Sequence, residues 1–167
     1  MGNTENNLMK SFSGESQASQ KYKAFAIKAE QEGYPQVAKL FRASSKSETI
    51  HAANQLRILK GINSTKDNLK SAIEGETYEY TNMYPKFIDE SKLEDKKNAE
   101  YVFKAAMTTE EDHALYYKEA LKYIEMNKDI PEKEYYVCTI CGYTSENGAP
   151  DKCPICRAIS QKFIKIE

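Results

Sequence analysis

The chain has 167 residues, and 40% of them are apolar, which is enough for one domain with a hydrophobic core and a small appendage. Its 24 basic and 25 acidic residues give a net charge of −1, which argues against a nucleic-acid partner or a membrane surface, because both usually require a basic surplus. The amino terminus has no secretory signal, and no apolar run reaches the ~18 residues of a membrane span, so we expect neither secretion nor membrane anchoring.

Two amphipathic helices are predicted in the first part of the chain. Apolar residues at helical spacing run over 4–32, and Gly33 then supplies a stop. Pro35 suits a first helical position, and a second apolar stripe runs over 35–60 before Gly61. The side chains expected to face inward from this second helix include Val37, Leu40 and Ile50. The two segments predict a helical hairpin.

Two further amphipathic helices are predicted over 68–89 and 95–126. Pro85 lies inside the first of them and removes one backbone donor, so we expect a kink there. With the first hairpin this makes four amphipathic helices, which is the pattern of a four-helix bundle.

The composition changes after the fourth helix. The segment 128–134 is polar and contains a proline, which is typical of a linker. Beyond it, apolar runs at 135–137 and 163–166 predict short strands. We therefore assign 1–127 to the bundle and 135–167 to a small second domain.

The only two histidines each close a Glu-x-x-His run. The runs are Glu48-Thr-Ile-His51 and Glu110-Glu-Asp-His113, and they lie 62 positions apart. A lone glutamate precedes each run, and these two residues, Glu15 and Glu76, lie 61 positions apart. A separation of three places Glu and His on one helix face, roughly 5–6 Å apart at Cβ, where both can bind one metal ion. The chain is therefore interpreted as a duplicated helical hairpin in which the two offsets, 62 and 61, differ by one residue.

These acidic residues and histidines lie near the middle of their helices, on faces that are otherwise apolar. Burying several carboxylates in one core is costly unless positive charge accompanies them. Di-iron and di-manganese bundles use a characteristic ligand set: two helices supply one Glu each, and each of the other two supplies a Glu-x-x-His run. Carboxylate and imidazole suit either metal. A solvated Glu/His pair usually explains a single run, but two runs that use every histidine favour a metal pair.

Three further residues are candidates for this site. Glu79 adds a carboxylate on the same predicted helix as Glu76. Tyr22 lies two turns after Glu15, and Tyr84 lies five residues after Glu79, so either hydroxyl could donate a hydrogen bond to a ligating carboxylate. The alternative for both is a core tyrosine whose hydroxyl has another partner.

All four cysteines lie in the second domain, as two C-x-x-C pairs. They are Cys138, Cys141, Cys153 and Cys156. Four thiolates at this spacing predict a tetrahedral metal site, which could hold structural zinc or an iron for electron transfer. Cysteines used for metal rather than for disulfides agree with a reducing cytoplasm.

The bundle and the cysteine domain together resemble the rubrerythrin family over 12–163. The stretches that carry this resemblance are Gly14-Glu-Ser-Gln, Glu32-Gly-Tyr, Asn68-Leu-Lys, Ile73-Glu-Gly-Glu-Thr-Tyr-Glu and Met83-Tyr-Pro. Cys141-Gly-Tyr143 and Cys153-Pro154 resemble a rubredoxin, although Arg157 stands where a glycine is expected. The resemblance implies a mainly α protein, with a ferritin-like bundle followed by a rubredoxin-like domain. It also implies a peroxidase of anaerobes or microaerophiles that reduces hydrogen peroxide at a di-iron centre and protects against oxidative stress.

The resemblance also implies roles for individual residues. Glu48 and Glu110 would bridge the two irons, Glu15 would hold one of them, and Glu76 with His113 would hold the other. Glu79 would exchange with His51 as a ligand between the oxidised and reduced states, so Glu48, His51, Glu79 and Glu110 are the expected catalytic residues. One iron bound by the four cysteines would relay electrons from an external donor, either a rubredoxin or an NAD(P)H-dependent reductase. The family forms head-to-tail homodimers, which bring one chain's cysteine domain close to the other chain's di-iron site.

The predicted connector between the second and third helices, 61–67, is short. Keeping Glu48 and Glu76 level in a ferritin-like bundle would require it to return roughly 30 Å, whereas seven residues reach at most ~25 Å. We therefore predict a domain-swapped dimer in which the first two helices pack on the partner chain's last two. The alternatives are a shortened second helix or a simple up-down topology.

Two other functions remain open from the sequence. A ferritin-like ferroxidase or iron store needs the same ligands but has no need of an electron-transfer domain. A non-catalytic binding protein with a zinc ribbon would need fewer buried ligands than the chain offers.

Overall fold

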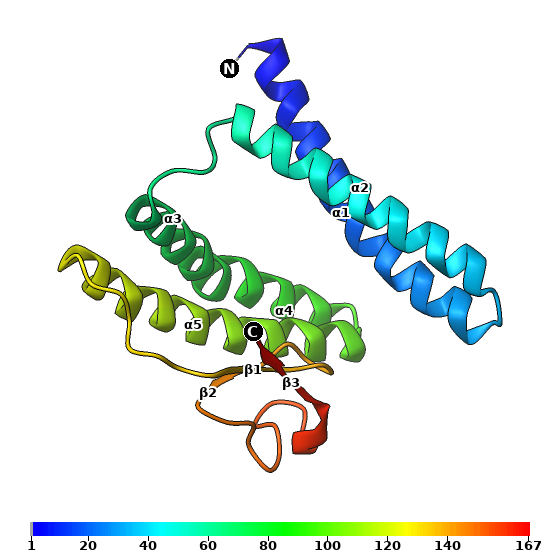
Figure 1. Ribbon diagram of the computed structural model, residues 1–167. Helices are drawn as coiled ribbons and strands as arrows, with labels where there is room; N and C mark the ends of the chain where they lie inside the picture. Colours follow the sequence, from blue (N-terminus) through cyan, green and yellow to red (C-terminus); the bar gives the residue numbers. More distant parts are fainter. Residues whose placement is uncertain (1) are drawn as a thin grey trace. The chain divides into compact units, whose positions relative to one another are not determined.

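The computed structural model describes residues 2–167, which are mainly helical and end in a small sheet (Figure 1). The chain divides into two compact units, one up to Asn63 and the other from Ser64 onward. In the described part of the chain, no helix is both long and apolar enough to cross a membrane.

The first unit is a hairpin of two long helices, α1 (Asn3–Gln31) and α2 (Pro35–Ile58). Gly33 makes the turn between them with φ at +81°, a conformation that glycine adopts without steric cost. Small side chains fill the helix interface, and the core is Ala26, Ala29 and Ala38 with Phe41 packed against it. Alanines allow the two helix backbones to approach closely. The hairpin and its helix boundaries agree with the sequence prediction to within about two residues.

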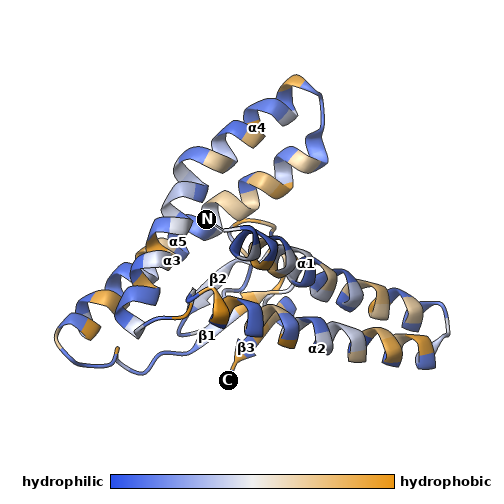
Figure 2. Ribbon diagram, turned by 90° about the horizontal axis from the view of Figure 1, so that it is seen from above, coloured by the Kyte–Doolittle hydropathy of each residue, from blue (hydrophilic) through white to orange (hydrophobic). Residues whose placement is uncertain are grey.

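The sequence expectation for the inward face of α2 was wrong in part. The exposed fractions of Val37, Leu40 and Ile50 are 45%, 64% and 49%. In Figure 2, hydrophobic positions recur along both α1 and α2. Two helices share only one interface, which cannot cover the whole apolar stripe of either helix. The hairpin therefore keeps apolar surface that a complete bundle would cover.

The second unit begins with α3 (Thr65–Tyr78), three residues earlier than the sequence predicts. The reason is a cap at Ser64, whose hydroxyl oxygen accepts a hydrogen bond from the backbone N–H of Asp67 at 3.2 Å. The Ser64 hydroxyl also donates to Asp67 Oδ2 at 2.6 Å. The helix start is thus fixed by a serine that belongs to the predicted connector.

The predicted third helix continues to Leu93, but a π-helical turn interrupts it. This turn, η1 (Glu79–Met83), separates α3 from α4 (Tyr84–Leu93). The backbone N–H of Tyr84 donates to the carbonyl of Glu79, five residues earlier, just before Pro85 removes a donor. The helix is therefore interrupted by a π turn that begins at a candidate ligand and ends just before Pro85, whereas the kink predicted at Pro85 stays a prediction.

α5 (Lys97–Glu125) packs along α3 and α4, and a three-stranded antiparallel sheet follows it. The strands are β1 (Tyr135–Cys138), β2 (Thr144–Glu146) and β3 (Phe163–Ile166), and β1 is the central one. A short 3-10 turn, η2 (Ser160–Lys162), precedes β3. The predicted fold class, four helices followed by a small domain with short strands, is confirmed. The division at residues 127 and 135 stays a prediction.

Candidate metal centres

The first unit brings three predicted ligands together. Glu15 from α1 and Glu48 and His51 from α2 each offer a ligand atom, and these atoms lie within 4.8 Å of one another. Nδ1 of His51 lies 2.8 Å from Oε2 of Glu48, as expected for residues three apart on a helix. The His51 side chain is 51% exposed, so this group lies at the surface of the hairpin. We refer to these three residues as the first half-site.

The second unit repeats this arrangement with Glu76 from α3 and Glu110 and His113 from α5. Nδ1 of His113 lies 2.8 Å from Oε2 of Glu110 and 3.8 Å from Oε1 of Glu76. The hydrogen bond with Glu110 raises the pKa of His113, while burial acts in the opposite direction. Burial, followed by repulsion from Glu110, raises the pKa of Glu76. We refer to Glu76, Glu110 and His113 as the second half-site.

Glu79 lies beside the second half-site but is not one of its three clustered residues. Burial and the charge of Glu110 raise the pKa of Glu79 above its usual value. Glu79 is the first residue of the π turn, and this turn sets the position of Glu79 relative to Glu76. The second unit therefore crowds three carboxylates around one imidazole, and bound metal ions would compensate the repulsion between the carboxylates.

The two candidate tyrosines differ in their surroundings. The Tyr84 ring packs near Phe87 and Phe103. The pKa of Tyr84 is raised by burial, and then by the charge of Glu79 and by those of the two carboxylates of the second half-site. Tyr22 packs near Phe25 and Phe41. Among residues 2–167, neither hydroxyl donates a hydrogen bond to a carboxylate. A role for either tyrosine in positioning ligands stays a prediction.

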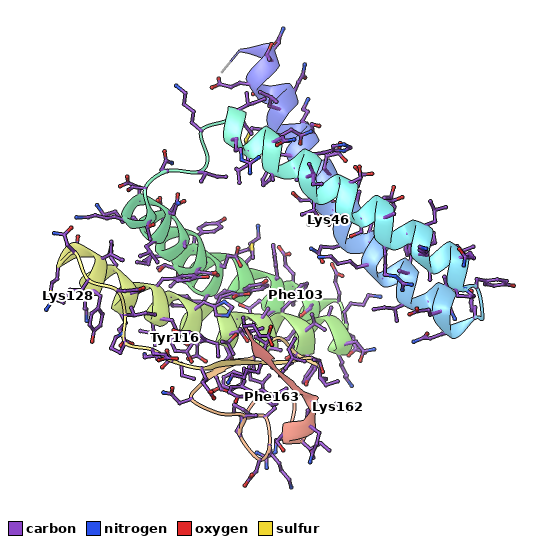
Figure 3. The ribbon with its side chains drawn as sticks, viewed as in Figure 1. Lys46, Phe103, Tyr116, Lys128, Lys162 and Phe163 are labelled. Carbon is purple, nitrogen blue, oxygen red and sulfur yellow. The ribbon has the colours of Figure 1, made fainter. Side chains whose placement is uncertain are left out.

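A residue that the sequence does not indicate contacts the second half-site. Nε2 of His113 lies 3.1 Å from Oγ1 of Thr144, at the start of β2. The Tyr116 hydroxyl, one turn along α5, donates to the Thr144 carbonyl at 3.3 Å. Figure 3 shows Tyr116 on the side of α5 that faces the strands. Thr144 belongs to no metal-ligand pattern, so no sequence signal pointed to it.

The four cysteines form one cluster, as predicted. The Sγ atoms of Cys138 and Cys156 lie 3.6 Å apart, and those of Cys141 and Cys153 lie 3.5 Å apart. A disulfide would need about 2 Å, whereas thiolates about 2.3 Å from a tetrahedral metal lie roughly 3.8 Å apart. Burial tends to raise the pKa of Cys138, but the backbone N–H groups of Ile140 and Cys141 lower it to about 7. These sulfur atoms are arranged for one metal ion.

The two cysteine turns have the same backbone geometry despite different residues. Gly142 follows Cys141 with φ at +84°, and Arg157 follows Cys156 with φ at +63°. An L-residue in this region costs roughly 1–2 kcal/mol. The arginine in place of the expected glycine therefore strains the backbone locally but keeps the metal-binding turn.

Comparison with known proteins accounts for both parts of the chain. The family model described as Rubrerythrin matches residues 6–121, and the one described as Rubrerythrin, rubredoxin-like domain, matches residues 136–164. The chain belongs to the rubrerythrin family.

Individual relatives and a solved structure agree with this assignment. The chain is 34% identical to Rubrerythrin-2 of Clostridium acetobutylicum, with 93% of this chain and 92% of that protein covered. It is also 34% identical to nigerythrin of Nitratidesulfovibrio vulgaris, with coverages of 93% and 83%. A structure of nigerythrin in a partially reduced state matches 99% of this chain and 88% of that chain, with a TM-score of 0.58 and 32% identity.

The donor atoms fit the metals of a rubrerythrin. The family combines a di-iron domain with a rubredoxin-like domain, and this chain has carboxylate and imidazole clusters in the first and four thiolates in the second. Iron binds readily to both donor sets. Which residue ligates which iron stays a prediction.

Proposed function

We propose that this protein reduces hydrogen peroxide to water at a di-iron centre, with electrons supplied through an iron bound by the four cysteines. The observation that carries the proposal is the presence, on one chain, of two carboxylate–histidine half-sites and a four-thiolate cluster. Iron storage alone gives no reason for the thiolate cluster, and electron transfer alone gives no reason for the half-sites.

Each group of residues has a chemical role in this reaction. Reduction of one peroxide to two waters consumes two electrons and two protons, and a ferrous pair held by these residues would supply the two electrons. Glu48 and Glu110 would bridge the irons, with Glu15 on one and Glu76 and His113 on the other. Glu79 and His51 would alternate as ligands, since a carboxylate suits the more highly charged oxidised pair and a neutral imidazole suits the reduced pair.

Both half-sites would contribute to one centre through an exchange of helices between two chains. Six residues, 59–64, connect α2 to α3. Keeping Glu48 and Glu76 level in a ferritin-like bundle would require a return of roughly 30 Å, whereas this connector reaches at most about 25 Å. The uncovered apolar side chains of α2 also need a partner. In the exchanged homodimer, α1 and α2 of one chain pack on α3 to α5 of the other.

The proposed partners follow from the same chemistry. The oxidised cysteine-bound iron must be reduced by an external donor, a rubredoxin or an NAD(P)H-dependent reductase. Free thiolates that hold iron suit a reducing cytoplasm, where the protein would protect against oxidative stress.

The test is anaerobic reconstitution with iron, reduction, and rapid mixing with hydrogen peroxide or with oxygen. We expect peroxide to reoxidise the di-iron pair and the cysteine-bound iron rapidly, and oxygen to do so more slowly. A matched variant, Glu110→Gln, should lose the peroxide reaction while it keeps the absorbance of the cysteine-bound iron. Faster reaction with oxygen, accompanied by growth of a ferric mineral, would instead identify a ferroxidase. Zinc in the cysteine site of protein produced with ample iron would contradict the proposed electron supply.

A further inference from the structure

Three hydroxyl-bearing residues join α1 to α2 close to the first half-site. The Ser45 hydroxyl donates to the carbonyl of Ser19 at 2.8 Å, and the Thr49 hydroxyl donates to the carbonyl of Ser45 at 2.9 Å. Oγ of Ser19 lies 2.9 Å from Oγ1 of Thr49. Because a hydroxyl carries one proton and Thr49 already donates its own, Ser19 is the donor in this third contact. We refer to Ser19, Ser45 and Thr49 as the hydroxyl cluster.

The hydroxyl cluster is closed on itself. Each of its three hydroxyls donates to another member of the cluster, so all three protons are used within it. Ser19 and Ser45 are 4% and 3% exposed, which places two of the three side chains inside the helix interface. A proton relay would need a member that donates to a group outside the cluster. These contacts therefore serve to hold the two helices instead of to move protons.

The cluster specifies how α1 is aligned along α2. The rest of this interface has a core of alanines, whose contacts bring the helices close together but have no direction. Ser45 and Thr49 lie one turn apart on α2, and they contact different atoms of Ser19, its carbonyl and its hydroxyl. α1 therefore cannot slide along α2 and keep both contacts. Fixing the register of packed helices is the best-attested role of polar groups buried between them.

This alignment decides whether the first half-site is complete. Glu48 and His51 are three residues apart on α2, so that helix alone sets their spacing. Glu15 comes from α1, and it reaches the other two ligands only where the helices are correctly aligned. Ser19 lies one turn after Glu15, and Thr49 directly follows Glu48. The hydroxyl cluster thus lies within one helical turn of the ligand whose place depends on the register.

The second hairpin lacks this device at the corresponding positions. The residues offset by 61 from Ser19 and by 62 from the other two members are Tyr80, Met107 and Glu111, and none of them is a serine or a threonine. The buried Thr109 hydroxyl, on α5, donates at 3.0 Å to a carbonyl of its own helix. The duplicated hairpins therefore align their ligands in different ways.

We infer that Ser19, Ser45 and Thr49 are positioning residues for the metal ion bound by Glu15, Glu48 and His51. The hydroxyl cluster fixes the register of α1 against α2 and so keeps Glu15 beside the two ligands on α2. The inference rests on the di-iron centre of the proposed function, but it does not depend on the reaction with peroxide.

The experiment uses the full chain with zinc in the cysteine site and with Co²⁺ as the probe of the half-sites. The chain has only two histidines, so the imidazole NMR signals of His51 and His113 report the two half-sites separately as paramagnetic Co²⁺ is added. Ser45→Ala and Thr49→Val should each weaken Co²⁺ binding at His51 by roughly tenfold or more, with a smaller loss at His113. Thr49→Ser keeps the hydroxyl and should bind Co²⁺ as the wild type does.

Ser16→Ala is the matched control. The Ser16 hydroxyl is also on α1 and is adjacent to Glu15, but it donates to the Phe12 carbonyl of its own helix at 2.7 Å. This variant should bind Co²⁺ normally at both histidines. Alanine favours helix more than serine does, so circular dichroism should show intact helices in both alanine variants. A loss of Co²⁺ binding in Ser45→Ala would then reflect ligand alignment and not unfolding.

The outcomes separate this inference from the proposed reaction. Unchanged Co²⁺ binding at His51 in Ser45→Ala and Thr49→Val would overturn the inference, and so would an equal loss at His51 and His113. Wild-type protein that binds no Co²⁺ beside either histidine would refute the di-iron centre, and the inference with it. Normal Co²⁺ binding without any peroxide reaction would refute only the proposed reaction.

Discussion

His113 and Glu110 form a close pair in which Nδ1 lies 2.8 Å from Oε2, and the same distance separates His51 from Glu48 in the first half-site. The two pairs differ in what surrounds them. The His113 side chain is 27% exposed and has Thr144 on its other nitrogen, whereas the His51 side chain is 51% exposed. Nε2 of His51 lies 3.5 Å from the Ser47 hydroxyl, at the limit of a hydrogen bond. His51, the histidine expected to exchange with Glu79 as an iron ligand, is thus the less constrained of the two.

Metal binding should respond to pH through the second half-site. Its environment raises the pKa values of Glu76, Glu79 and His113, so the folded metal-free protein holds these protons more tightly than the unfolded chain does. The free energy of unfolding of the metal-free protein should therefore fall as pH rises through these pKa values. Metal ions compete with the same protons, so their affinity should rise over the same range.

The measurement for this prediction is the melting temperature of metal-loaded and metal-free protein between about pH 5 and about pH 8. The melting temperature of the metal-loaded protein should exceed that of the metal-free protein by an amount that grows as pH rises. Glu110→Gln should reduce this pH dependence, because it removes a shared cause of the shifts at Glu79 and His113. If the gap between these melting temperatures instead narrows as pH rises, the second half-site does not bind metal in competition with protons.

Exchange of helices between chains predicts complementation of two inactive variants. Glu48→Gln damages the first half-site, and Glu110→Gln damages the second. In an exchanged dimer that contains one chain of each kind, one centre receives both lesions and the other receives none. Such mixed dimers should recover about half of the wild-type peroxide reaction, whereas each variant alone stays inactive. If every centre is built from a single chain, the mixed dimer will be as inactive as its parents.

Lys133 is expected to hold the linker against α5 and β2. Lys133→Met should remove its ion pairs with Glu119 and Glu146 and should make the linker segment 128–134 more accessible to proteases. The measurement is the rate of limited proteolysis at this segment, followed by mass spectrometry. Lys128→Met, on an exposed residue of the same region, serves as the control. Equal cleavage of the two variants would show that the Lys133 contacts do not hold the linker.

Arg157→Gly should stabilise the cysteine domain. Glycine adopts a positive φ without the steric cost paid by arginine, so we expect a gain of about 1 kcal/mol. The gain should appear as a higher temperature for loss of the iron–thiolate absorbance. Arg157→Ala removes the side chain but retains the Cβ, and it should not give the gain. Equal stabilisation by both substitutions would attribute the effect to the arginine side chain instead of to the backbone.

Much of the site could be predicted because its ligands follow the helical repeat. Glu48 with His51 and Glu110 with His113 are local pairs, and their geometry depends only on a spacing of three. The cysteine cluster was predictable for a similar reason, since each C-x-x-C turn is local.

The features that the sequence did not predict depend on tertiary context. The contact between His113 and Thr144 joins segments 31 residues apart, without any periodic pattern. The exposure of Leu40 depends on how many helices pack around it, which a hydrophobic stripe does not specify. The early start of α3 depends on a single serine cap at Ser64, where helix boundaries are least certain from sequence.

The π turn at Glu79 accounts for the one-residue difference between the two repeat offsets, 61 for the lone glutamates and 62 for the Glu-x-x-His runs. Each hairpin has a three-residue turn, and Glu48 and Glu110 each lie thirteen residues after the start of their helix. Sixteen residues separate Glu15 from the end of α1, whereas seventeen separate Glu76 from the end of α4. The additional residue therefore lies in the helix that holds the wider π turn, which accommodates an insertion without changing the connections on either side. The one-residue difference therefore leaves the spacing of Glu48 and Glu110 from their own helix starts equal, and the π turn gives Glu79 a backbone position that has no counterpart in α1.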